Sequence, residues 1–193
     1  MERAKTTVRP VTAARLADVE ALFGTSKTTT GCYCMWFLLP NRECAAGWSG
    51  GNRVRFDELT KAPGPPLGLL AYRGREPVGW AAAGPRSRYA RALRSTVLKQ
   101  REPEEDDQVW LLPCFYVRRD ARRSGVTLEL IEAAVALAGK HGATSVEAFP
   151  LTGAGRRGTG EAFVGVEPQF AMCGFTPVAR PTPARVVMRR DLT

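Results

Sequence analysis

The chain has 193 residues, of which 44% are hydrophobic and 24% charged, as is typical of a soluble globular protein with a substantial core. Its longest uninterrupted apolar run, at residues 32–39, is far shorter than the roughly 20 residues that a membrane-spanning helix needs. The formal net charge of +9 favours anionic ligands such as nucleotides and phosphates. Arginines are spread along the whole chain and no nucleic-acid motif with interleaved aromatic residues is present, so a nucleic-acid partner has only the charge in its favour.

The cysteines do not follow the pattern of a disulfide framework or of a metal site. They number five, an odd count. Cys32, Cys34 and Cys44 could supply three zinc ligands, but a structural site needs four and the only histidine is His141. We therefore expect buried free thiols and no bound metal. Residues 1–7 lack the apolar core of a signal peptide, so we expect a cytoplasmic protein with no membrane partner.

The first half of the chain alternates between strand and helix patterns. In the first predicted helix, Leu16, Val19, Leu22 and Phe23 recur at helical spacing until Gly24. The expected elements are a strand at 6–11, a helix at 13–23, a loop rich in threonine and glycine, an aromatic patch at 33–39, a helix at 52–61 and a β-hairpin formed by 67–73 and 77–83. No repeat and no linker divides the sequence, so we expect one domain at residues 1–193.

The second half contains the most strongly patterned segments. Residues 109–117 form a continuous apolar strand that Pro113 interrupts, because proline cannot donate to a strand ladder. Residues 123–140 are the strongest amphipathic helix, and Gly142 is placed to end it. The remaining expected elements are a helical stripe at 86–99, a solvated acidic loop at 101–108, a strand at 143–149, a helix at 161–173 and two closing strands at 175–180 and 185–190.

The junction between the strand that ends at Val117 and the helix that follows is suited to an anion. The first turn of a helix leaves backbone N–H groups unpaired, and the helix dipole adds positive potential there. Gly125 would let a phosphate approach the backbone without a Cβ in the way. Four arginines surround the same point: Arg118, Arg119, Arg122 and Arg123. The alternative to an anion site is a helix that begins with basic residues and a glycine that has no role in binding.

Residues 122–127, with the sequence Arg-Arg-Ser-Gly-Val-Thr, resemble motif A of the GNAT superfamily of N-acetyltransferases. In that motif Arg/Gln-x-x-Gly-x-Gly/Ala follows a strand that ends in valine. Thr127 replaces the last small residue, although its N–H remains able to bind phosphate. The order of predicted elements from about residue 8 to 192 is similar to that of the family, and Cys173-Gly174-Phe175 resembles the end of its last helix.

The resemblance implies an α/β (α+β) GNAT fold. Its central sheet would be mixed and mostly antiparallel, with a splayed parallel strand pair and helices on both faces. The parallel pair, at 109–117 and 143–149, would leave a cleft for the pantetheine arm of acetyl-CoA, the implied co-substrate. The backbone of Phe115, Tyr116 and Val117 would bind the acetyl and pantetheine end. The pyrophosphate would lie on the segment Arg122, Arg123, Ser124, Gly125, Val126 and Thr127.

The residues for proton transfer are not where the resemblance places them. Many relatives use a glutamate early in the strand before motif A, where this chain has Leu111, and a tyrosine in the last helix, where it has Phe170. Tyr116, beside the expected acetyl position, and Glu147, inside the partner strand, are the best catalytic substitutes. Packing of Tyr116, or a salt bridge from Glu147 to an arginine, is the alternative.

The sequence does not name the amine acceptor. Tyr33 and Trp36 lie in an aromatic patch where relatives bind the acceptor, although the patch could also be core or a homodimer surface. The acidic loop at 101–108 could attract a cationic amine. We expect direct attack of a small-molecule or peptide amine on acetyl-CoA in a ternary complex, since no cysteine has a base partner. A catalytically degenerate domain that binds and senses acyl-CoA is the main alternative.

Overall fold

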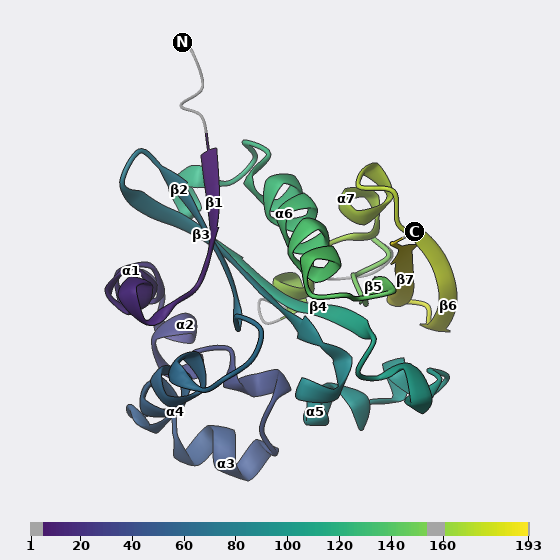
Figure 1. The fold of residues 1–193 in the computed structure, drawn as a ribbon, viewed down its shortest axis with the longest axis horizontal. Coiled ribbons are helices and arrows are strands. Elements are labelled where there is room, and N and C mark those ends of the chain that lie inside the picture. The colour runs from purple at the N-terminus through teal and green to yellow at the C-terminus, as the bar shows by residue number, and fades with distance from the viewer. Residues whose placement is uncertain (1–5, 154–160, 193) are drawn as a thin grey trace.

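A computed structural model of the chain describes residues 6–153 and 161–192 (Figure 1). Residues 1–5 and 154–160 lie outside these ranges. Residues 1–5 are part of the N-terminal segment from which we expect a cytoplasmic protein, and residues 154–160 precede the predicted helix at 161–173. None of the helices within the described ranges has both the length and the apolar character that crossing a membrane requires.

The centre of the fold is a seven-stranded sheet with the strand order β1-β2-β3-β4-β5-β7-β6. Only the β4–β5 pair is parallel, and the other neighbours run antiparallel. The strands are β1 (Thr6–Pro10), β2 (Gly68–Arg73), β3 (Glu76–Pro85), β4 (Val109–Val117), β5 (Ser145–Ala148), β6 (Thr176–Thr182) and β7 (Arg185–Asp191). The expected mixed, mostly antiparallel sheet is confirmed, including the parallel pair.

Helices cover both faces of this sheet, with α6 and α7 on one side and α1 to α5 on the other (Figure 1). The α-helices are α1 (Leu16–Phe23), α2 (Lys27–Cys32), α3 (Asn41–Ala46), α4 (Gly51–Lys61), α5 (Ala90–Leu93), α6 (Val126–Lys140) and α7 (Glu167–Met172). Short 3-10 turns lie between them: η1 (Ala13–Arg15), η2 (Met35–Phe37), η3 (Arg86–Arg88), η4 (Thr96–Leu98), η5 (Pro103–Glu105), η6 (Arg119–Ala121) and η7 (Glu161–Val164).

Alternating side chains of the strands supply hydrophobic cores on both faces of the sheet. On β2, Leu69 contributes to the core beneath α6, whereas Leu70 contributes to the core beneath α1 and α4. The second core contains an aromatic cluster in which Phe23 and Phe56 pack edge-on against Trp80, with ring centroids 5.5 and 5.7 Å apart. Burial on both faces explains why β2, β3 and β4 are apolar along nearly their whole lengths.

The strand at 109–117 and the β-hairpin before it are confirmed. The helix predicted at 123–140 is also present, but it begins at Val126. Its late start has a backbone cause, because Arg123 and Gly125 have φ values of 60° and 90° and therefore cannot be helical. Gly142, with a φ of 75°, follows the helix end as predicted.

Several local expectations were wrong. The loop predicted before the aromatic patch contains helix α2, which Ser26 caps by accepting a hydrogen bond from Thr28 N at 3.3 Å. The stripe at 86–99 is divided into short turns, since Ser95 is extended. The helix predicted at 161–173 is divided in two by Gly165, which has a φ of 77°.

Candidate active site

The turn between β4 and α6 presents a row of unpaired backbone amides. Leu128 and Glu129 are the first amides of α6 to donate to a carbonyl, and both donate to Gly125 O, at 2.9 and 3.2 Å. Within the described part of the chain, no acceptor is found for the five amides from Arg123 to Thr127. A Cβ added to Gly125 would meet no atom within 4 Å, so the approach to these amides is open. Such a turn can bind an anion through its backbone alone.

The arginines around this turn differ in how free they are. Arg118 forms ion pairs with Asp120 and Glu76, at 2.7 and 2.9 Å, so its charge is largely balanced. Arg122 donates from Nε to Val117 O at 3.0 Å and braces the end of the strand. Arg119 and Arg123 are exposed and have no ion-pair partner in the described ranges. The positive charge available to a ligand therefore comes from these two and from Arg122, whose bond to a carbonyl leaves its charge unbalanced.

Arg73, which the sequence did not single out, also reaches the turn. Its guanidinium Nη2 donates to Ser124 Oγ, and Ser124 Oγ donates in turn to Ala121 O at 2.6 Å. Arg73 ends β2, about 50 residues before Ser124, and only the pairing of the strands brings the two together. No pattern near residue 122 could have indicated this contact.

The parallel pairing of β4 with β5 is short. It covers three register positions, from Val109–Ser145 to Leu111–Glu147, and ends before Pro113. From residue 112 to Val117 β4 pairs only with β3, so the backbone edge of Phe115 to Val117 on the β5 side has no strand partner. An open edge of this kind can form hydrogen bonds with an extended ligand.

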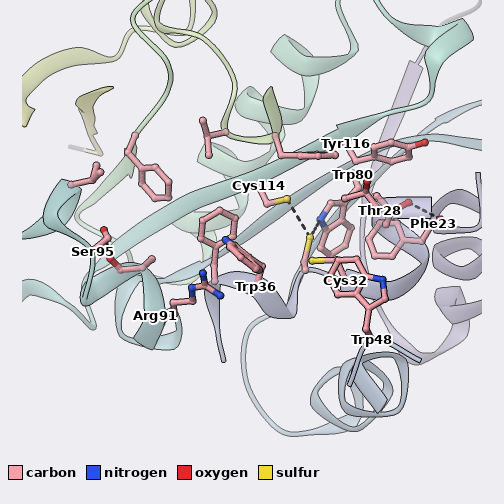
Figure 2. A pocket seen from close by; sticks show the side chains of 18 of the residues that line it. Phe23, Thr28, Cys32, Trp36, Trp48, Trp80, Arg91, Ser95, Cys114 and Tyr116 are labelled. Carbon is pink, nitrogen blue, oxygen red and sulfur yellow. Dashed lines mark hydrogen bonds between the residues drawn. The ribbon is translucent and has the colours of Figure 1, made fainter. Parts of the chain in front are cut away.

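A cavity of about 560 Å³ lies on the face of the sheet opposite α6, beside the open edge of β4 (Figure 2). Cys114 and Tyr116 line it from β4, and Phe149 lines it from the segment after β5. Its walls are mainly aromatic and aliphatic, with Trp36 and Trp48 at the side of the N-terminal helices. Pockets of this size and character bind small organic molecules.

Thiols and an indole form one wall of this pocket. Trp80 donates from Nε1 to Cys34 Sγ at 2.9 Å, and the Cys34 thiol donates to Cys114 Sγ at 3.4 Å. The hydrogen bond to Cys114 and burial both raise the pKa of the Cys34 thiol well above its ordinary value. Each of the five cysteines is a free thiol. The raised pKa makes the Cys34 thiol an inert hydrophobic group rather than a nucleophile.

Tyr33 and Trp36, which the aromatic patch offered as acceptor-binding residues, are separated by the fold. Tyr33 is buried in the second core, with its ring 5.2 Å from Phe23, and does not line the pocket. Trp36 does line it and is 44% exposed. The backbone explains the difference, because Tyr33 and Cys34 both have positive φ and turn successive side chains in different directions.

Tyr116 lines the pocket, and its hydroxyl bonds to Thr25, just after α1. The hydroxyl is 2.7 Å from Thr25 Oγ1, which donates its own proton to Leu22 O at 2.6 Å. Tyr116 must therefore be the donor in the bond to Thr25. Its oxygen keeps lone pairs that can accept a further hydrogen bond.

Glu147 lies in a different hollow, of about 210 Å³. Its carboxylate accepts from Arg86 Nη1 at 2.8 Å and lies 3.5 Å from Arg189. Arg86 is fully buried and also binds Asp106, at 2.6 Å. This cluster has two consequences for the sequence predictions. Glu147 forms a salt bridge with an arginine, which is the alternative to a catalytic role that the sequence left open. Asp106 and Glu105 of the acidic loop at 101–108 form ion pairs with Arg86 and Arg189, so this part of the loop is not simply solvated.

Comparison with known proteins identifies the family. The sequence model of the acetyltransferase (GNAT) family matches residues 33–154, more than half of the chain. The chain belongs to the GNAT acetyltransferase family. No protein of curated function is similar enough in sequence to count as a match.

Solved GNAT structures share the whole fold at low sequence identity. An acetyltransferase from Thermus thermophilus has 19% identity and a TM-score of 0.55, with 100% of each chain covered. A GNAT family acetyltransferase from Streptococcus pneumoniae has 11% identity and a TM-score of 0.56, covering 98% of this chain and 100% of its own. A Salmonella typhimurium protein solved with its cofactor acetyl-CoA has 14% identity and a TM-score of 0.54, covering 97% and 94%.

The two positions that many GNAT enzymes use for proton transfer are apolar and buried here. Leu111 and Phe170 both have 0% exposure. Phe170 packs edge-on against Phe115 and Phe175, with centroids 5.8 and 5.3 Å apart. The described residues also contain no group of His, Cys, Asp and Glu side chains that could hold a metal ion.

Proposed function

We propose that this GNAT protein is an N-acetyltransferase that moves the acetyl group of acetyl-CoA to a primary amine held in the apolar pocket. The observation that carries the proposal is the position of the open edge of β4 between two sites. The free amides of Arg123 to Thr127 follow this edge, and the pocket lies beside it on the opposite face of the sheet. A donor and an acceptor could therefore meet at Tyr116.

The amide row fits the pyrophosphate of acetyl-CoA. Five unpaired N–H groups at a helix start, an open approach at Gly125 and the exposed Arg123 favour an anion with several oxygens. The backbone of Phe115 to Val117 would pair with the amide groups of the pantetheine arm. Acetyl-CoA supplies the thioester, whose carbonyl carbon is the electrophile.

The pocket itself helps the amine to lose its proton. An alkylamine has a pKa near ~10 in water and is mostly charged at neutral pH. Within the described ranges no Asp or Glu lines the pocket, whereas Arg91 and Arg185 do. Burial among apolar side chains and the nearby guanidinium groups both favour the neutral amine. A dedicated general base is then less necessary, because positioning supplies much of the rate.

We assign Tyr116 to holding the amine. Its oxygen accepts a hydrogen bond from an N–H of the amine while its own O–H continues to donate to Thr25 Oγ1. The amine nitrogen bonds to the acetyl carbon as the carbon–sulfur bond breaks, the nitrogen loses one proton and the sulfur gains one. Glu147, the other expected catalytic residue, holds Arg86 and Arg189 in a neighbouring hollow, so the geometry favours a positioning role for it.

One observation favours a second candidate, an acyl-CoA-binding sensor without turnover. Both positions that commonly carry the proton-transfer groups are fully buried apolar residues, Leu111 and Phe170. A sensor would keep the amide row and need no amine. The acceptor pocket argues for the enzyme, because a sensor has no use for a second cavity beside the thioester.

A thiol-release assay distinguishes the two candidates. The intact protein is mixed with acetyl-CoA and a panel of amines, and free CoA thiol is followed over time. Amine-dependent release, with the acetylated amine identified by mass spectrometry, is the expected result. Tight binding of acetyl-CoA with no release for any apolar amine supports the sensor. Failure to bind acetyl-CoA excludes both candidates.

A further inference from the structure

Arg91, on helix α5, has an unusual place in the apolar pocket. Its guanidinium carbon lies 3.5 Å from the centroid of the Trp36 ring. Its Nη1 is buried and has no hydrogen-bond partner, and no carboxylate of the described residues forms an ion pair with it. Burial lowers the pKa of the Arg91 guanidinium below its ordinary value. A buried polar atom without a partner costs free energy and calls for an explanation.

Neighbouring arginines show what a satisfied guanidinium looks like in this protein. Arg86 binds Asp106, Glu147 and the carbonyl of Glu102. Arg88 donates to three backbone carbonyls, at 2.7, 2.9 and 3.1 Å. Arg91 is the next arginine in the chain, and it has only the face of an indole. The missing partner of Arg91 is therefore best sought in a ligand.

We propose that Arg91 binds a carboxylate of the acceptor, so that the substrate is an amine whose anionic group is separated from it by an aromatic or aliphatic body. This inference rests on the proposed acetyltransferase function. The charge-assisted hydrogen bonds of a carboxylate would satisfy Nη1, and Trp36 would hold the guanidinium plane in place.

The positions of the two polar ends define the substrate class. Arg91 and Trp36 lie well apart from Tyr116 in the pocket, with Cys114 between them (Figure 2). An α-amino acid carries its amine and carboxylate on one carbon and cannot reach both ends. An aminoalkyl-aryl acid or a long ω-amino acid can. Polyamines are disfavoured because the described lining has arginines and no acidic residue.

Two isomers and one ester provide a matched set of probes. Para-aminomethyl-phenylacetate has its amine and carboxylate at opposite ends of a ring, phenylalanine is its isomer with both on one carbon, and the methyl ester of the first lacks the charge. We expect kcat/KM with saturating acetyl-CoA to be about 10- to 100-fold higher for the first acid than for its ester or for phenylalanine, as a buried charged hydrogen bond contributes.

The variant Arg91→Met should lower kcat/KM for the acid about 10- to 100-fold more than kcat/KM for the ester, and the ester controls for folding and for any effect on the amine. Arg94→Met removes an exposed arginine near the end of the same helix and should change neither value. Equal kcat/KM for acid and ester in the wild-type protein, or equal losses for both in Arg91→Met, would overturn the inference while leaving acetyl transfer intact.

A binding measurement separates the inference from the proposed function. Trp36, Trp48 and Trp80 all line the pocket, so the intrinsic tryptophan fluorescence can report on its occupancy. If no probe is acetylated but the acid quenches this fluorescence in the wild type and not in Arg91→Met, the carboxylate site stands and the enzyme proposal fails. If the acid also fails to bind, the inference is wrong.

Discussion

Leu111 and Glu147 face each other at the last register position of the parallel ladder between β4 and β5. The position that carries a carboxylate in many GNAT enzymes is thus apolar, and its register partner across the ladder is a glutamate. That carboxylate is engaged, since Glu147 lies 2.8 Å from Arg86 and 3.5 Å from Arg189. Its role is therefore tested by separating stability from proton transfer.

Glu147→Gln should destabilise the protein by about 3 kcal/mol, because it leaves the buried Arg86 guanidinium with less compensation. Urea unfolding measures the loss. Glu105→Gln is the matched control, since Glu105 binds Arg189 at the rim and is part-exposed, and it should cost less than about 1 kcal/mol. The pH–rate profile of Glu147→Gln should keep its shape. A stable variant that loses one limb of that profile would return the role of base to Glu147.

Tyr116→Phe should lower kcat/KM for the amine by about tenfold, since one neutral hydrogen bond to the substrate is removed. Binding of acetyl-CoA should hardly change, because the backbone of Tyr116 is retained. Thr25→Val removes the partner of the hydroxyl and leaves the hydroxyl in place, so it should have the smaller effect. Steady-state kinetics with a single amine measures both variants. Full activity in Tyr116→Phe would contradict the assignment.

The thiols should react slowly at neutral pH. Burial raises the pKa of Cys32 to about 12, and burial with the nearby Glu132 raises the pKa of Cys173 to about 11. Labelling of Cys32 and Cys173 in the folded protein by an aromatic disulfide, followed by peptide mass spectrometry, should therefore rise about tenfold per pH unit from about pH 7 to pH 10, where a free cysteine with a pKa near ~8.5 would reach a plateau. A plateau near pH 8.5 would contradict the burial of these thiols.

The same shifts fix the sign of a stability change. A thiol whose folded pKa lies above its unfolded value of about 8.5 keeps its proton longer in the folded state. Its contribution to stability is complete below about pH 8.5 and is lost as the pH rises toward the folded pKa. Thermal unfolding between pH 8 and pH 11 should show a falling Tm. A Tm that is constant across this range would contradict the shifts.

The parts of the fold that could be predicted are those that local pattern determines. The continuous apolar run of β4 and the helical stripe of α6 are properties of consecutive residues, so both elements were found. The proline at residue 113 likewise indicated where the pairing of β4 with β5 would end. The free amides follow from the helix start itself, which Gly125 marked in advance.

The contacts that could not be predicted join distant residues. Arg86 and Glu147 are 61 residues apart, and Arg73 and Ser124 are 51 apart, so each pairing depends on the assembled sheet. The acidic loop looked solvated for the same reason, since two of its arginine partners, Arg86 and Arg189, lie on other elements. Tyr33 and Trp36 looked equivalent in the sequence. The left-handed backbone at Tyr33 and Cys34 directs the Tyr33 side chain into the core and leaves Trp36 in the pocket lining.

The amide row can be disrupted with a matched control. Gly125→Val places a branched side chain at a φ of 90° in the approach to the amides, and Arg123→Asp reverses a nearby charge. Aspartate tolerates the left-handed backbone of Arg123, so the strain comes mainly from the valine, at about 1 to 3 kcal/mol. Gly142→Val imposes similar strain at the other end of α6, where φ is 75° and a Cβ also meets open space.

Calorimetric titration with acetyl-CoA tests the central claim most directly. Wild-type protein and Gly142→Val should bind with similar micromolar or tighter affinity, whereas Arg123→Asp with Gly125→Val should lose detectable binding and keep its circular dichroism spectrum. Wild-type affinity in that double variant would contradict the claim that the turn from Arg123 to Thr127 holds the pyrophosphate.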